Sequence, residues 1–153
     1  MTRQWHKTGV LIIEGHVQGL ANARSAGEAG IPVIVTDKNN CLARYSRYCS
    51  LFVKCPDYSS DAFIDFLIDL GKRESLTGWM LLPSNDHAVY NISRNKTRIE
   101  TIYKTFIPSA GIIESIYNKE NLLNIAGRSG IPVPRSWFPD TWEPLTDINY
   151  PAL

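Results

Sequence analysis

A strand, helix and strand pattern near the N-terminus constrains the fold more than any other feature of the chain. Residues 8–13 are rich in Val and Ile, are too short for a helix and end at a Glu-Gly pair, which predicts a buried strand. Residues 31–37 repeat that pattern, and the segment between them has small and apolar residues at helical spacing before Gly30. This order predicts a right-handed βαβ unit in a parallel sheet.

The same alternation continues along the chain. We expect further strands at residues 50–54 and 78–82, a helix that starts at Ser59, Ser60 or Asp61 and stops at Gly71, and a helix after residues 83–86. A weaker helical period follows in residues 97–106, then a short turn, a helix over about residues 118–129 closed by Gly130, and a strand near residues 135–138. The predicted fold class is α/β, with an open, mainly parallel sheet flanked by helices.

Composition places few limits on function. The chain of 153 residues has 44% hydrophobic residues, 20% charged residues and a net charge of +1, so it has no electrostatic signature for nucleic acid or an anionic membrane. Its apolar runs are far shorter than the ~20 residues that span a bilayer, and its N-terminus lacks a signal-peptide apolar region. We therefore expect a cytoplasmic protein with no nucleic-acid or membrane partner.

The three cysteines, Cys41, Cys49 and Cys55, have spacings that fit neither a zinc site nor a redox Cys-x-x-Cys pair. They are expected to be reduced structural thiols. No set of residues has metal-ligand spacing, and neither a Gly-x-Ser-x-Gly elbow nor a Walker A loop is present. We expect no metal site in this chain.

Ligands of open parallel sheets bind beyond the carboxyl ends of the strands. The loop after the first expected strand holds Gly15 and Gly19, which either present backbone amides to an anion or serve only a tight turn. Asp37 ends the second strand, where it is either a ribose ligand or a capping or solvated turn residue. His16 and His87 are candidate acids, bases or substrate contacts, or plain loop histidines.

Ser84, Asn85 and Asp86 follow the strand at residues 78–82. They could present hydrogen bonds or a carboxylate to a small polar substrate. One of them could equally cap the following helix. The residue types alone leave both roles open.

Three segments together resemble the N-terminal part of an ATP-grasp ligase of the carbamoyl-phosphate-synthase-like and D-aspartate-ligase-like group. They are EGHVQGLANARSAGEAGIPVIVTD, LLPSNDHAVYNISRNK and IYNKENLLNIAGRSGIPVPRSW. The last is the most specific, since Asn118-Lys119, the Gly-Ile-Pro-Val-Pro at residues 130–134 and Tyr150-Pro151 follow the family order. The resemblance implies a Rossmann-like pre-ATP-grasp domain at residues 1–108, a linking helix and strand at 109–137, and a connector at 138–153 towards an ATP-grasp module that this chain lacks.

The resemblance implies a reaction that uses ATP and Mg²⁺ to form an acyl phosphate, which an amine then attacks. It makes Lys119 a nucleotide contact, against the alternative of a solvated first-turn lysine. The implied contacts to the carboxylate or amine substrate are Glu14, Gly15, His16, Gly19, Ser84, Asn85 and Asp86. No catalytic residue is expected in this chain, which should be inactive without its own C-terminal ATP-grasp domain; a homodimer is an open alternative for the whole enzyme.

Two other functions fit parts of the pattern. A stand-alone Rossmann-type nucleotide-binding domain would use the first loop and Asp37. A regulatory or interaction module could use Trp137 and Trp142 as anchors.

Overall fold

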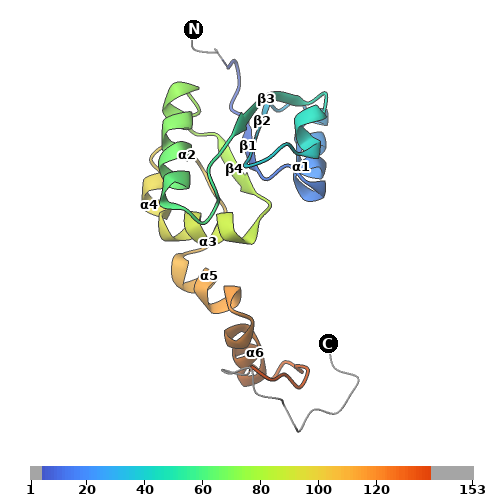
Figure 1. Cartoon of the computed structure of the whole chain (residues 1–153), viewed down its shortest axis with the longest axis vertical. Helices are drawn as coiled ribbons and strands as arrows, with labels where there is room; N and C mark the ends of the chain where they lie inside the picture. The colour runs from blue at the N-terminus through green and yellow to red at the C-terminus, as the bar shows by residue number, and fades with distance from the viewer. Residues whose placement is uncertain (1–4, 139–153) are drawn as a thin grey trace.

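The computed structural model describes residues 5–138. Within that range, four parallel strands form one sheet in the order β3-β2-β1-β4 (Figure 1). The strands are β1 (Val10–Ile13), β2 (Val33–Asp37), β3 (Cys49–Lys54) and β4 (Met80–Pro83). The α/β fold with an open parallel sheet is therefore confirmed, and each strand lies within two residues of its expected position.

Helices cover both faces of the sheet (Figure 1). Helix α1 (Val17–Glu28) and the 3-10 helix η1 (Leu42–Tyr45) lie on one side, and α2 (Asp61–Arg73), α3 (Asp86–Arg94) and α4 (Lys96–Ile99) lie on the other. Two apolar cores result, because alternate residues of a strand point to opposite faces. Leu11 and Ile13 pack with α2 and α3, whereas Val10 and Ile12 pack with Ala23 of α1 and Ala43 of η1.

Two helices extend from the α/β body beside α3 (Figure 1). They are α5 (Ala110–Tyr117) and α6 (Lys119–Arg128). Ile113 is the buried residue of α5, and α6 has none. The Asn118 side chain caps α6 by accepting a hydrogen bond from the Asn121 amide at 3.1 Å, and Gly130 follows the helix at φ 75°.

Several local expectations were wrong. Residues 110–117 form α5 where a short turn was expected, and the weak helical period after Lys96 is the single turn of α4. Beyond α4, Lys104 makes an isolated parallel bridge to Met80 at the free edge of β4. Residues 131–138 contain no strand, since the backbone there is irregular around Pro132 and Pro134, whose nitrogens cannot donate to a ladder. Trp142, Tyr150-Pro151 and most of the expected connector lie outside the described residues.

Gly71 does not stop α2, which runs two residues further to Arg73. A Cβ on Gly71 would lie 2.6 Å from Cγ2 of Ile102 and 2.8 Å from Oη of Tyr103. The Tyr103 hydroxyl is buried and donates to the Leu67 carbonyl at 2.8 Å. Gly71 is therefore required for close packing of α2 against the segment after α4.

Replacing Gly71 by Ala should destabilise the protein by about 1–3 kcal/mol, because the added methyl group overpacks Tyr103. This loss opposes the roughly 1 kcal/mol that a Gly to Ala change contributes inside a helix. Gly111→Ala in α5 is the matched control, since a Cβ there meets nothing within 4 Å. Urea unfolding should show a loss for Gly71→Ala and none for Gly111→Ala; equal effects would contradict the packing role.

The three cysteines are free thiols, as expected. Burial is the main cause that raises the pKa of Cys55 to about 11, with a smaller contribution from the Asp37 carboxylate. Burial also raises the pKa values of Cys41 and Cys49. All three are therefore neutral at physiological pH and poor nucleophiles in the folded protein.

Because the pKa of Cys55 is higher folded than unfolded, its contribution to stability is complete below pH ~8.5 and is lost as the pH rises towards about 11. Between pH 8.5 and 10.5 the free energy of unfolding should fall by roughly 2 kcal/mol more in wild type than in Cys55→Ala. Urea unfolding at both pH values measures the difference. Parallel losses in the two proteins would show that Cys55 is not buried in this way.

Candidate functional site

The strand order reverses between β1 and β4. The chain passes from β1 outwards through β2 to β3, and then returns to place β4 on the other side of β1. In open parallel sheets the ligand crevice lies at such a reversal, beyond the carboxyl ends of the two strands. Glu14 and Gly15 follow β1, and Ser84, Asn85 and Asp86 follow β4.

The structure brings the two predicted segments together. The Ser84 amide donates to the Ile13 carbonyl at 2.9 Å, which extends the ladder between β1 and β4 by one bond. The Asn85 side-chain nitrogen then donates to Oε1 of Glu14 at 3.3 Å. Asn22 of α1 makes a long contact of 3.4 Å to the Ser84 hydroxyl. Glu14 and Asn85 are thus hydrogen-bonded to each other, and Ser84 precedes Asn85 at the same end of the sheet; these three residues are called the polar group at the reversal.

Of the two roles that the sequence left open for this cluster, the structure shows the capping role for Asn85, and contact with a substrate stays a prediction. Its Oδ1 accepts from the amides of His87 at 3.0 Å and Ala88 at 3.2 Å, so it caps α3. Its side-chain nitrogen is then directed to Glu14. Capping fixes the orientation of the amide, and that orientation holds the Glu14 carboxylate.

Glu14 has a left-handed backbone conformation, with φ 69°, that non-glycine residues seldom adopt. Such strain persists where surrounding contacts enforce it, and it gathers at functional sites. Here the Glu14 amide donates to the Thr36 carbonyl at 2.9 Å. The next residue, Gly15, is hydrogen-bonded through both its amide and its carbonyl. The side chain is partly buried and keeps one carboxylate oxygen without a partner among the described residues.

Gly15 and Gly19 serve close packing. A Cβ on Gly15 would collide with Sγ of Cys41, and one on Gly19 would collide with the Glu14 carbonyl oxygen. The Gly15 amide donates to Oδ2 of Asp37 at 2.9 Å, and its carbonyl accepts from the Ala43 amide at 2.8 Å. The Gly15 amide is thus already occupied and is not free to bind an anion.

Asp37 is neither a solvated turn residue nor an exposed ribose ligand. Its side chain is buried, with 2% of the residue exposed. One carboxylate oxygen accepts from the Gly15 amide, and the other accepts from the Asn39 amide at 3.0 Å. The carboxylate joins the carboxyl ends of β1 and β2.

His16, Asp86 and Lys119 are exposed, and they do not meet at one point. His16 occupies the position before α1 without a side-chain cap. Asp86 and Lys119 line a hollow of about 520 Å³ between α3, α5 and α6, which does not include His16. His87, Ile113, Ile116 and Leu122 also line it. Lys119 therefore shares this hollow with Asp86, and Glu14 is not among the residues that line it.

A polar cavity that the sequence did not predict lies beside α3. It has a volume of about 420 Å³, and its lining includes Asp61, His87, Tyr90, Arg94, Asn95 and Tyr117. Tyr117 Oη is hydrogen-bonded to His87 Nδ1 at 2.5 Å and its ring stacks on Tyr90 at 4.6 Å. A signal was present in the sequence, since His87, Tyr90, Asn91 and Arg94 follow the i, i+3, i+4, i+7 spacing of one helix face.

No protein-family model and no curated protein matches the chain. Within residues 5–138, no helix is long and apolar enough to cross a membrane. The features of the molecule that bear on function are the polar residues at the strand reversal and the two hollows beside α3.

Asp37→Ala should destabilise the protein by about 1–3 kcal/mol, because the buried Gly15 amide would lose its acceptor. Asp69→Ala is the control, since Asp69 lies exposed on α2 and makes no hydrogen bond or ion pair in the described residues. Chemical denaturation measures both variants. A loss no larger than that of the control would mean that the carboxylate does not hold the loop.

Proposed function

We propose that the chain is the N-terminal, pre-ATP-grasp domain of an ATP-dependent carboxylate-amine or carbamoyl-phosphate-synthase-like ligase. The observation that carries the proposal is the polar group of Glu14, Ser84 and Asn85 at the strand reversal. Two loops far apart in sequence supply it, and the sequence resemblance assigns the same positions to the acid or amine substrate. Asp86 and His16 extend the proposed contact surface at its exposed margin.

The polar residues at the strand reversal offer the chemistry that small polar substrates need. The free oxygen of the Glu14 carboxylate can accept a hydrogen bond from an ammonium or hydroxyl group, and the Ser84 hydroxyl can donate or accept. Gly15 and Gly19 contribute by keeping the loop close to β2 and α1, so their role in the proposal is to position Glu14. These residues bind and orient; none of them is assigned a bond-making role.

Lys119 is the proposed nucleotide contact. It is the first residue of α6, is exposed, and makes no ion pair in the described residues although Asp86 lines the same hollow. Among the described residues that line the hollow, Lys119 is the one cation, and Ile113, Ile116 and Leu122 form an apolar wall. This fits one contact to a phosphate group beside an apolar surface and not a complete triphosphate cradle. The rest of the ATP and Mg²⁺ site is accordingly assigned to a C-terminal ATP-grasp domain.

The proposed reaction has two steps. A carboxylate oxygen of the substrate takes the γ-phosphoryl group of ATP, with ADP as leaving group, to form an acyl phosphate. The amine nitrogen then attacks the acyl carbon and inorganic phosphate leaves. The contribution of this domain is to hold the acid or amine in line, which lowers the barrier by restricting motion. The isolated chain is proposed to be inactive, and cytoplasmic as part of the whole enzyme.

Asp37 counts against the rival proposal of a self-sufficient dinucleotide-binding domain. A ribose hydroxyl would have to displace the Gly15 or Asn39 amide from a buried carboxylate. Displacement would leave a backbone donor unsatisfied, at a cost of about 1–3 kcal/mol. The Gly15 amide is also unavailable to a pyrophosphate.

Lys119→Gln in the full-length protein should weaken Mg-ATP binding by about tenfold, the loss expected for one charge-assisted hydrogen bond. The melting temperature should change little, because the side chain is exposed. Isothermal titration and thermal melting measure the two quantities.

Lys72→Gln is the matched control for this prediction. Lys72 is also an exposed helical lysine without an ion pair in the described residues, and it lies in the last turn of α2, away from the hollow. Equal affinity of the two variants for Mg-ATP would show that Lys119 does not contact the nucleotide. A large loss of stability in Lys119→Gln would instead make the lysine structural.

A further inference from the structure

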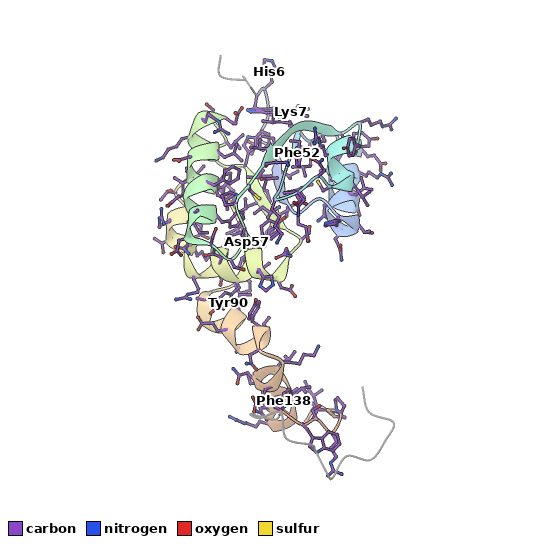
Figure 2. All side chains as sticks on the ribbon, in the orientation of Figure 1. His6, Lys7, Phe52, Asp57, Tyr90 and Phe138 are labelled. Atoms are coloured by element: carbon purple, nitrogen blue, oxygen red, sulfur yellow. The ribbon has the colours of Figure 1, made fainter. Side chains whose placement is uncertain are left out.

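The polar cavity beside α3 is separate from the proposed substrate crevice. Its walls come from the start of α2, one face of α3 and the end of α5, and it contains none of Glu14, Ser84 and Asn85. Its volume of about 420 Å³ falls in the range of small-molecule sites. Figure 2 marks Tyr90 where α3 and α5 meet.

An ordered layer of side chains forms one wall of this cavity. The Arg94 guanidinium lies 5.8 Å from the centre of the Tyr90 ring, and that ring stacks on Tyr117 with an interplanar angle of 24°. Tyr117 is in turn hydrogen-bonded to His87. The wall therefore joins α5 to α3 and gives the cavity an aromatic surface next to a cation.

The amides of Asn91 and Asn95 are fixed beside this wall. The Asn91 side-chain nitrogen donates to the carbonyls of Tyr58 at 2.9 Å and Ser60 at 3.0 Å. Oδ1 of Asn91 accepts from the Asn95 side-chain nitrogen at 3.1 Å. These bonds orient Asn95 so that its own Oδ1 has no donor among residues 5–138. Asn95, whose amide nitrogen is held in this way, is one of the residues that line the cavity.

Two opposite charges line the cavity without an ion-pair partner in the described part of the chain. Arg94 and Asp61 make no salt bridge there, whereas the nearby Asp57 and Asp65 are paired with Lys38 and Arg98. Arg94 is a donor-only group that matches a carboxylate, and Asp61 is an acceptor-only group that matches an ammonium. A ligand with only a negative charge would be repelled by the Asp61 carboxylate.

We propose that this cavity binds a small zwitterion of amino-acid type, which carries one carboxylate and one ammonium group. The carboxylate accepts hydrogen bonds from Arg94, and the ammonium donates to Asp61 and to Oδ1 of Asn95. The ligand's side chain packs on the rings of Tyr90 and Tyr117. The site is additional to the proposed substrate crevice, and its occupancy does not depend on the proposed ligase function.

Isothermal titration of the chain with glycine and the standard L-amino acids tests the proposal. Acetate, ethylammonium and inorganic phosphate serve as probes with charge of one sign. At least one amino acid should bind at least about tenfold more tightly than any of these three. If inorganic phosphate binds as tightly as the best amino acid, the cavity is an anion site and the zwitterion proposal is wrong. If no amino acid saturates the protein, the cavity is not a binding site for amino acids.

Two variants locate the binding. Arg94→Gln should weaken the best amino acid by about tenfold or more, whereas Arg128→Gln, an exposed arginine in the last turn of α6, should leave it unchanged. Asp61→Asn should weaken binding of the amino acid and reduce the difference between its affinity and that of acetate. Circular dichroism checks that each variant is folded. If Arg94→Gln does not fold, the affinity of Asp61→Asn tests the proposal in its place. Unchanged affinity in a folded Arg94→Gln or Asp61→Asn would overturn the proposal.

Discussion

The hydrogen bonds to the buried carboxylate of Asp37 are the interactions on which the geometry of the strand reversal depends. The carboxylate accepts from the amides of Gly15 and Asn39, and thereby joins the ends of β1 and β2 where no strand pairing remains. The Gly15 amide donates to Asp37 and its carbonyl accepts from the Ala43 amide of η1, and these bonds hold the loop in which Glu14 has its left-handed conformation. Glu14 is then directed to Asn85 at the end of β4. The Asp37 carboxylate is therefore buried and accepts two backbone hydrogen bonds, whereas the sequence pattern left a role as a ribose ligand as one alternative.

The strands and the principal helices could be predicted from the sequence because their signals are local. Val and Ile runs that are too short for a helix mark the strands of β1 and β2, and the apolar period of α2 is strong. The errors occurred where tertiary packing overrides local preference. Gly71 reads as a helix stop, yet it is required inside α2 because Tyr103 packs against it. The helix α5 was missed because it has only eight residues, although Ile113, Ile116 and Tyr117 recur at helical spacing.

The candidate site was predictable to the extent that topology alone fixes it. The rule that ligands bind beyond the carboxyl ends of parallel strands selects Glu14, Ser84 and Asn85 without any knowledge of side-chain contacts. That Asp37 would be buried was not predictable, because its partner Gly15 belongs to another loop. The polar cavity beside α3 was missed because its charges, Asp61 and Arg94, come from different helices. Only the polar face of α3 was visible in the sequence. The role of Lys119 depends on the resemblance and stays a prediction.

The proposed ligase function is tested most directly by nucleotide titration of two polypeptides, residues 1–153 and a version extended through the reading frame beyond Leu153. Mg-ATP and NAD are each titrated into both by calorimetry. The proposed function predicts that the extended polypeptide binds Mg-ATP and not NAD, and that residues 1–153 bind neither tightly, since Lys119 is the one nucleotide contact assigned to them. Tight binding of NAD by residues 1–153 would contradict it and would require Asp37 to exchange its backbone partners for a ribose.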